Sequence, residues 1–188
     1  MDLVSWAREL SCQVLAVELP RRWAHVQGVA YRARIVSAVL PGLDGDLLMA
    51  AAYLHDIGYS SMLAETGFHP LDGARFLKEK GVEGRLCALI AHHSCAYREA
   101  ELRGLSAELA EWTDERTLVR DALWWADMTT TPDGEKTTVH DRIEEIQKRY
   151  GPEDLVTYFI RQAKGELVSA VERTESRLRE TGVDYTAK

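Results

Sequence analysis

A histidine and an aspartate are adjacent in Leu54-His55-Asp56-Ile57-Gly58-Tyr59, the most informative stretch of the chain. The rest of the chain supplies more side chains of the same two kinds. In chain order these are His25, His69, His92, His93 and Asp127. Imidazole nitrogens and carboxylate oxygens are ligands of divalent transition metals in proteins. The set is large enough to hold two ions.

Apolar residues recur at helical spacing through nearly the whole chain. Leu3, Trp6, Leu10 and Val14 give a stripe that predicts a first helix over 3–15. No segment alternates in the manner of a strand, so we expect an all-α fold, a helical bundle. Further helices are predicted over about 20–40, 44–56, 70–80, 83–93, 114–127, 139–150 and 153–179, with one short helix within 94–111. Asp44 and Asp114 are the expected N-caps of two of them, and Gly58 is the expected breaker after the third.

The length and composition predict a single domain. The chain has 188 residues, 46% of them hydrophobic and 28% charged, which is enough apolar mass for a core. We expect one domain over 1–188, with a metal-binding core at about 20–130 and C-terminal helices at about 139–180. The charged face of the last helix is either solvated or the packing surface of a homodimer, and the sequence leaves both open.

The charge and the cysteine content indicate which partners and which cellular compartment to expect. The net charge of −7 argues against a nucleic-acid polymer as partner, because a phosphate backbone requires a basic surface. The three cysteines are odd in number and form no CxxC pair, which is typical of a reduced cytoplasm. The first ten residues, MDLVSWAREL, do not resemble a signal peptide, and no segment is apolar enough to span a membrane.

Most of the candidate ligands lie at ends of predicted helices, where side chains can face a shared cleft. We expect one ion to be bound by His25, His55, Asp56 and Asp127. A second ion would share Asp56 and be bound by His69 and His92. Successive residues on a helix point about 100° apart, so a bridging carboxylate at Asp56 fits beside a terminal imidazole at His55.

The order His, His-Asp, His, His, Asp on a helical chain resembles the HD-domain metalloprotein superfamily, over His25 to Asp127. In motif layout the chain is most similar to the bacterial HD-domain diadenosine tetraphosphatases. Those enzymes have an Arg just before the first His, as Arg22 is here, a Gly-Ala-x-x-Leu stretch, here 73–77, and a hydrophobic-Ala-Asp triplet, here 125–127. One departure concerns the residues after Gly58: many HD enzymes have a Lys there, whereas this chain has Tyr59 and Ser60.

The resemblance implies a metal-dependent phosphohydrolase. We expect it to cleave a phosphoester or phosphoanhydride of a small phosphorylated compound, such as a nucleotide, by means of a metal-bound hydroxide. Asp56 and His93 are the expected catalytic residues. His93, adjacent to the expected ligand His92, either protonates the leaving group or serves as a ligand at a third centre. Arg22 and Lys136 are the expected substrate-binding cations, and Arg142 is a weaker candidate. The cofactor would be two divalent ions, chosen among Fe, Mn, Co, Ni and Zn.

Two other functions remain open at the level of sequence. HD-domain di-iron oxygenases carry the same extended set of ligands and cleave a C–C or C–P bond. A non-catalytic metal-binding regulatory module is the third interpretation, and the lack of a recognisable second domain weakens it. The ligands alone do not separate the first two functions.

Overall fold

The computed structural model describes residues 2–186, so residues 1, 187 and 188 at the ends of the expected domain lie outside the described part. Within 2–186 the chain is helical, and its β-structure is a single antiparallel bridge between Thr130 and Lys136. The predicted all-α fold is confirmed. No helix in this part of the chain has both the length and the apolarity to span a bilayer.

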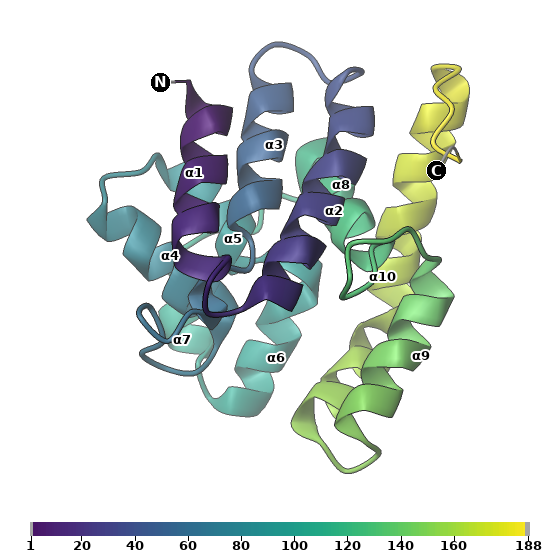
Figure 1. Cartoon of the computed structure of the whole chain (residues 1–188). Coiled ribbons are helices and arrows are strands. Elements are labelled where there is room, and N and C mark those ends of the chain that lie inside the picture. The colour runs from purple at the N-terminus through teal and green to yellow at the C-terminus, as the bar shows by residue number, and fades with distance from the viewer. Residues whose placement is uncertain (1, 187–188) are drawn as a thin grey trace.

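The helices follow the expected order with small shifts at their ends (Figure 1). They are α1 (Leu3–Leu15), α2 (Pro20–Ser37), α3 (Asp44–Leu54), α4 (His69–Glu79), α5 (Gly84–Ala91), α6 (Ala96–Arg103), α7 (Ser106–Leu109), α8 (Leu118–Met128), α9 (Val139–Tyr150) and α10 (Leu155–Glu180), with two short 3-10 turns, η1 (Ile57–Tyr59) and η2 (His93–Cys95). The prediction of one short helix within 94–111 was wrong, because α6 and α7 share that segment. They are separated by Gly104 in the left-handed conformation.

Two expected helix caps were also wrong. Asp44 is the first helical residue of α3, and its carboxylate pairs with Arg85 instead of a backbone N–H. The hydroxyl of Thr117 caps α8, while the carboxylate of Asp114 binds the guanidinium of Arg120 at 2.7 Å. A backbone amide could also donate a charge-assisted hydrogen bond to these carboxylates, but an arginine adds the attraction between two opposite charges.

Helix α3 is the centre of the bundle. It packs against α1, α2, α5 and α8, and its Ala50, Ala51 and Ala52 are fully buried. Three successive small side chains let neighbouring helices approach from several sides. Leu54, also fully buried, ends the helix, so the following His-Asp pair emerges in the interior of the molecule.

The C-terminal helices form a second group beside this centre. Helix α10, drawn in yellow-green, runs along α8 and α9 and also contacts α6 (Figure 1). Since α8 ends beside Asp127, this arrangement brings α9 and α10 to the same end of the molecule as the His-Asp pair.

Two local features direct the chain at that end. Gly58 in η1 lies so close to α4 that a Cβ there would be 2.1 Å from the carbonyl oxygen of His69. The helix α3 has already ended at Leu54, so Gly58 serves close packing and not helix termination. In η2, Ser94 and Cys95 adopt the left-handed conformation, which bends the chain sharply after His93.

Candidate metal centre

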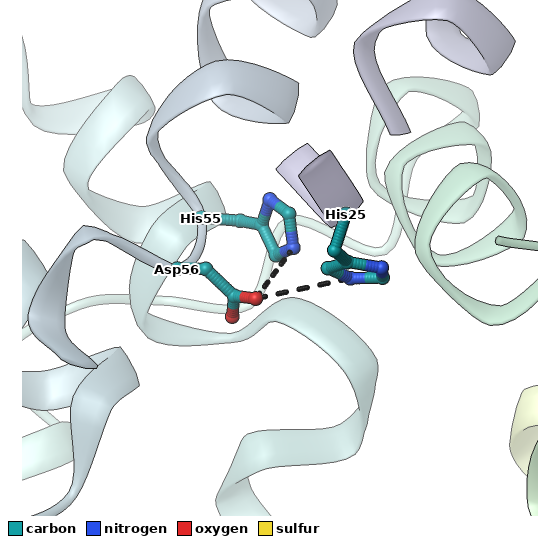
Figure 2. A group of neighbouring side chains, drawn as sticks. All are labelled: His25, His55 and Asp56. Carbon is teal, nitrogen blue, oxygen red and sulfur yellow. Dashed lines mark ion pairs between the residues drawn. The ribbon is translucent and has the colours of Figure 1, made fainter. Parts of the chain in front are cut away.

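The carboxylate of Asp56 lies between two pairs of histidines. Its side chain emerges at the break between α3 and η1, and the residue is 3% exposed. One oxygen, Oδ2, is 3.4 Å from Nε2 of His55 and 3.8 Å from Nε2 of His25, as Figure 2 shows. The three ligand atoms lie within 4.8 Å of one another. This spacing suits three donors around one ion.

The other oxygen of Asp56 faces the second pair. Oδ1 is 3.3 Å from Nε2 of His69 and 3.8 Å from Nε2 of His93. His69 begins α4 and His93 begins η2, so these donors come from elements that follow the His-Asp pair in sequence. Asp56, His69 and His93 also bring their ligand atoms within 4.8 Å. Two sets of three donors therefore share one carboxylate.

Asp127 at the end of α8 extends the first set. Its Oδ1 is 3.1 Å from Nε2 of His25, and its Oδ2 accepts a hydrogen bond from the hydroxyl of Ser94. Sequence reasoning missed Ser94, because a serine following a His-His doublet has no distinguishing spacing. Its left-handed backbone conformation directs the hydroxyl to this carboxylate.

Backbone carbonyls fix the orientation of three of the histidine rings. In each case Nδ1 lies within hydrogen-bond distance of a carbonyl oxygen, and a carbonyl can only accept. The pairs are His25 with Thr131 at 2.9 Å, His55 with Ala52 at 2.9 Å and His93 with Ile90 at 2.6 Å. A neutral ring that donates from Nδ1 has a lone pair on Nε2, and metal-binding histidines are commonly held in this way.

The lone pairs on Nε2 therefore face the carboxylates without a proton between them. Nε2 of His55 is buried and has no hydrogen-bond partner. At His25, Nδ1 and Nε2 both face oxygen atoms that accept, which a neutral imidazole cannot satisfy. A cation placed among these atoms would satisfy nitrogen and oxygen donors together. The residues present thus fit a bound divalent metal.

The pKa directions favour neutral rings at His25 and His93 and an ionised carboxylate at Asp56, whereas at His55 burial acts to lower the pKa but the charge of Asp56 outweighs it and raises the pKa. Burial, reinforced by the nearby rings of His69 and His55, lowers the pKa of His93 to about 3. Burial also lowers the pKa of His25, although Asp127 acts in the opposite direction. For Asp56, burial acts to raise the pKa, but His55 and Arg22 outweigh it and hold the pKa well below the usual range.

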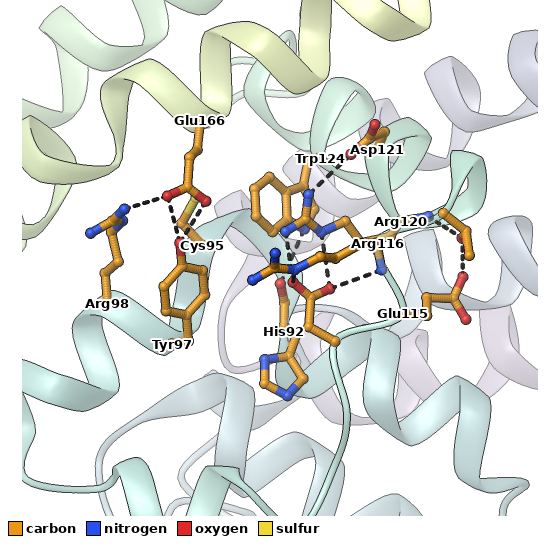
Figure 3. A network of polar contacts seen from close by, with 12 residues as sticks. His92, Cys95, Tyr97, Arg98, Glu115, Arg116, Arg120, Asp121, Trp124 and Glu166 are labelled. Carbon is orange, nitrogen blue, oxygen red and sulfur yellow. Dashed lines mark hydrogen bonds and ion pairs between the residues drawn. The ribbon is translucent and has the colours of Figure 1, made fainter.

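His92 does not join this cluster, so its expected position was wrong and His93 takes the place. The ring of His92 donates from Nε2 to the carbonyl of Trp112 at 2.7 Å, and its own carbonyl accepts from Nε1 of Trp124 (Figure 3). The doublet lies outside regular helix, since α5 ends at Ala91 and η2 begins at His93, and the two rings take different partners. With the turn at η2, the ring of His93 faces Asp56.

Arg22 lies directly against the cluster. Its Nη1 donates to Oδ2 of Asp56 at 2.7 Å, and its guanidinium stacks on the ring of Tyr59 at 4.0 Å. That ring stacks on His69 with centroids 3.9 Å apart. Burial would lower the pKa of Arg22, but the charge of Asp56 prevails and raises it. A permanent cation thus stands beside the His-Asp pair, supported by the tyrosine that occupies the position where a lysine is common.

A cavity of about 170 Å³ opens beside the cluster. Four arginines line it: Arg22, Arg103, Arg142 and Arg149. Arg142 was the weaker candidate for substrate binding, yet it is buried in the cavity wall with Nε lacking a partner. Arg103 and Arg149 were not anticipated, because isolated arginines on charged helices look like solvated residues.

Lys136 was expected at the cavity, and the structure does not place it there. Its ammonium is exposed and donates to the carbonyl of Thr186 near the C-terminus. The segment after Asp127 folds back through the Thr130–Lys136 bridge, which directs Lys136 away from the cluster. The same loop still serves the site, because it brings the carbonyl of Thr131 to His25.

Comparison with known proteins gives one match. The family model described as HD domain matches residues 22–131, which is more than half of the chain. No curated protein and no solved structure matches it. The matched segment begins at Arg22 and ends at Thr131, so it includes every residue of the His/Asp cluster but none of α9 and α10.

Proposed function

The chain belongs to the HD domain family, and from that premise we propose that it is a metal-dependent phosphohydrolase acting on a small phosphorylated compound. HD domains bind divalent metals, and the His/Asp groups of this chain are able to hold them. The finer proposal is that two ions bind, one on each side of Asp56, and that the reaction is the cleavage of a phosphate ester.

The position of the Asp56 carboxylate is the observation that supports this proposal. Its two oxygens face different histidine pairs at 3.3–3.8 Å, which is the arrangement a bridging ligand requires. A pair of ions held there would supply an activated water and neutralise charge on the phosphoryl oxygens. We propose His93 as a ligand and not as the acid that protonates the leaving group, because its Nδ1 donates to Ile90 and its Nε2 faces Asp56.

The arginines of the cavity favour a phosphorylated substrate. Arg22 lies 2.7 Å from Asp56, so its remaining N–H groups are placed to donate to a phosphoryl oxygen bound by metal ions that the same carboxylate would hold. The guanidinium stays charged at all relevant pH values and matches phosphate geometry. The chain's own contribution is therefore to orient the phosphoryl group and to stabilise the charge that develops on it.

A phosphate-release assay tests the proposal. The purified protein is loaded with Mn, Fe, Co or Mg and assayed against a panel of phosphate esters. We expect release with at least one metal, and we expect Asp56→Ala to abolish it. His140→Gln, which changes an exposed histidine of α9, is the matched control and should retain full activity. Turnover that requires dioxygen and iron, with no phosphate released, would instead identify the oxygenase.

A further inference from the structure

The cavity has two chemically different sides. Around Asp56 its wall is charged and polar. At the far side α9 and α10 contribute apolar side chains, among them Ile146, Val156, Phe159 and Ile160. These residues lie outside the segment 22–131 that matches the HD domain. Helix α9 also contributes Arg142 and Arg149 to this wall, so a phosphoryl group near Asp56 and an apolar substituent against Val156, Phe159 and Ile160 can be accommodated together.

Charge on the cavity wall limits how many phosphates it can hold. The four arginines are accompanied by three carboxylates that also line it: Asp56, Glu99 and Asp127. Arg103 is held by Glu99 at 2.7 Å, and Arg142 and Arg149 share Glu145 at 2.5 and 3.3 Å. Away from the metal centre each arginine already has a carboxylate partner. These three arginines face two carboxylates, so the excess of positive charge there is only one, which is little for a chain of several phosphates.

The volume of the cavity also argues against a substrate with a chain of several phosphates. Its volume of about 170 Å³ is below the roughly 300–1,000 Å³ that is usual for sites of drug-sized ligands. A dinucleotide is larger than such ligands. A single phosphoryl group with a compact substituent is of the right scale.

We propose that the substrate is a phosphate monoester of a compact apolar alcohol, and this inference rests on the proposed function. The phosphoryl group binds beside Asp56 at the ions that this carboxylate would hold, where Arg22 donates to it, and Arg142 donates to it from the opposite wall. Nε of Arg142 is buried without a partner, and the residue is 4% exposed. The alcohol part packs against Val156, Phe159 and neighbouring apolar residues of α9 and α10.

Binding of non-hydrolysable phosphonates tests the inference by a readout other than turnover. Isothermal titration calorimetry with the full chain, loaded with the same metal as in the activity assay, compares phenylphosphonate, methylphosphonate and 2-hydroxyethylphosphonate. We expect phenylphosphonate to bind about tenfold or more tightly than the other two, because only its substituent buries a large apolar area. Equal affinity for the three probes, or no binding of phenylphosphonate, would overturn the inference.

Matched variants separate the two sides of the cavity. Val156→Thr replaces one methyl by a hydroxyl at a half-buried site and should reduce the preference for phenylphosphonate severalfold. Val168→Thr, at a half-buried valine of α10 outside the cavity, should leave the preference unchanged. Arg142→Gln should weaken all three probes by a similar factor, whereas Arg161→Gln at an exposed position should weaken none. An effect of Val168→Thr equal to that of Val156→Thr would contradict the assignment of the apolar side.

The outcomes distinguish the inference from the proposed function. Selective binding of phenylphosphonate without phosphate release from any ester would contradict the hydrolase, and with it the monoester substrate, while supporting a cavity that takes a phosphoryl group with an apolar substituent. Phosphate release without any preference among the probes would support the hydrolase and contradict the apolar alcohol.

Discussion

At the scale of single residues, the proposed two-ion site depends on which oxygen of Asp56 faces which histidine nitrogen. Asp56 presents one oxygen to the His25 and His55 pair and the other to the His69 and His93 pair, because the chain turns directly after it at η1. The neighbouring Arg22 offsets part of the negative charge that gathers here. Its role can be tested separately from that of the ligands.

Arg22→Gln should lower phosphate release on the order of a hundredfold, because one charged donor to the phosphoryl oxygens is lost. Metal content, measured on the same sample, should stay near the wild-type value. Arg21→Gln is the matched control, since the neighbouring Arg21 pairs with Asp133 on the surface. Equal losses in the two variants would contradict a specific role for Arg22.

The three cysteines should differ in reactivity. Cys12 is exposed, whereas Cys87 and Cys95 are buried. Burial, and then the charge of Glu83, raises the pKa of Cys87 to about 11, so little thiolate forms at neutral pH. We expect a thiol reagent at pH 8 to modify one cysteine of the folded protein rapidly and the other two only in denaturant. Rapid modification of all three under native conditions would show that the interior opens readily.

At the scale of secondary-structure elements, the contact between η1 and α4 determines where His69 meets Asp56. Gly58→Ala should lower the free energy of unfolding by about 1–3 kcal/mol, because the added methyl group overlaps the backbone of α4. Gly84→Ala at the start of α5 is the control, since a Cβ there meets no atom within 4 Å. Thermal unfolding of both variants measures the difference, and equal melting temperatures would contradict the close packing.

Helices α6 and α10 are joined by Glu166, which accepts from the hydroxyl of Tyr97 at 2.6 Å and pairs with Arg98 (Figure 3). Burial acts to raise the pKa of Glu166, but these two partners outweigh it and lower the pKa from the ordinary 4.5. A lowered pKa stabilises the fold above pH 4.5, and this contribution is lost as the pH falls through the folded-state value.

The melting temperature of Glu166→Gln at pH 7 should therefore lie below that of the wild type by at most about 4 °C. The two proteins should begin to converge as the pH falls below 4.5 and should melt alike below the lowered folded-state pKa, where the wild-type carboxylate is protonated. Melting curves at a series of pH values measure this. A gap that stays constant down to the acid limit would show that the carboxylate charge has no part in the contact.

Helical periodicity predicted most of the elements, because apolar spacing directly reflects which face is buried. The bounds of α1 and α9 agree with the predicted 3–15 and 139–150. The doublet His92-His93 could not be resolved in this way. The choice between its two members depends on the turn at Ser94 and Cys95, where non-glycine residues adopt a left-handed conformation that no local pattern reveals.

The cationic side of the cavity was also beyond sequence reasoning. Arg142 and Arg149 are 120 and 127 residues after Arg22, and they reach the same cavity only because α9 packs on α10 beside the end of α8. Lys136 lies closer to Asp127 in sequence, yet the loop directs it elsewhere. Proximity in sequence to a ligand is thus a weaker guide than the packing of the element that carries the residue.

At the scale of the whole molecule, the HD-domain segment supplies the His/Asp cluster and the C-terminal helices supply the far wall of the cavity. The elements that carry the His/Asp cluster are spread from α2 to α8, so bound metal would join segments that are distant in the chain. Ligands that bind only the folded state stabilise it by about 2.7 kcal/mol at a hundred times their dissociation constant. Removal of metal by a chelator should accordingly lower the melting temperature by several degrees, and an unchanged melting temperature would contradict a metal centre that spans these elements.

We propose that Asp56 bridges two metal ions, and the metal content of the purified protein tests this claim. Inductively coupled plasma mass spectrometry after equilibration with Mn²⁺ and removal of free metal gives the ratio of metal to chain. We predict a ratio near two for the wild type, a ratio of one or less for Asp56→Ala, and a ratio near two for His140→Gln. A wild-type ratio near zero, or an equal ratio in wild type and Asp56→Ala, would contradict the claim.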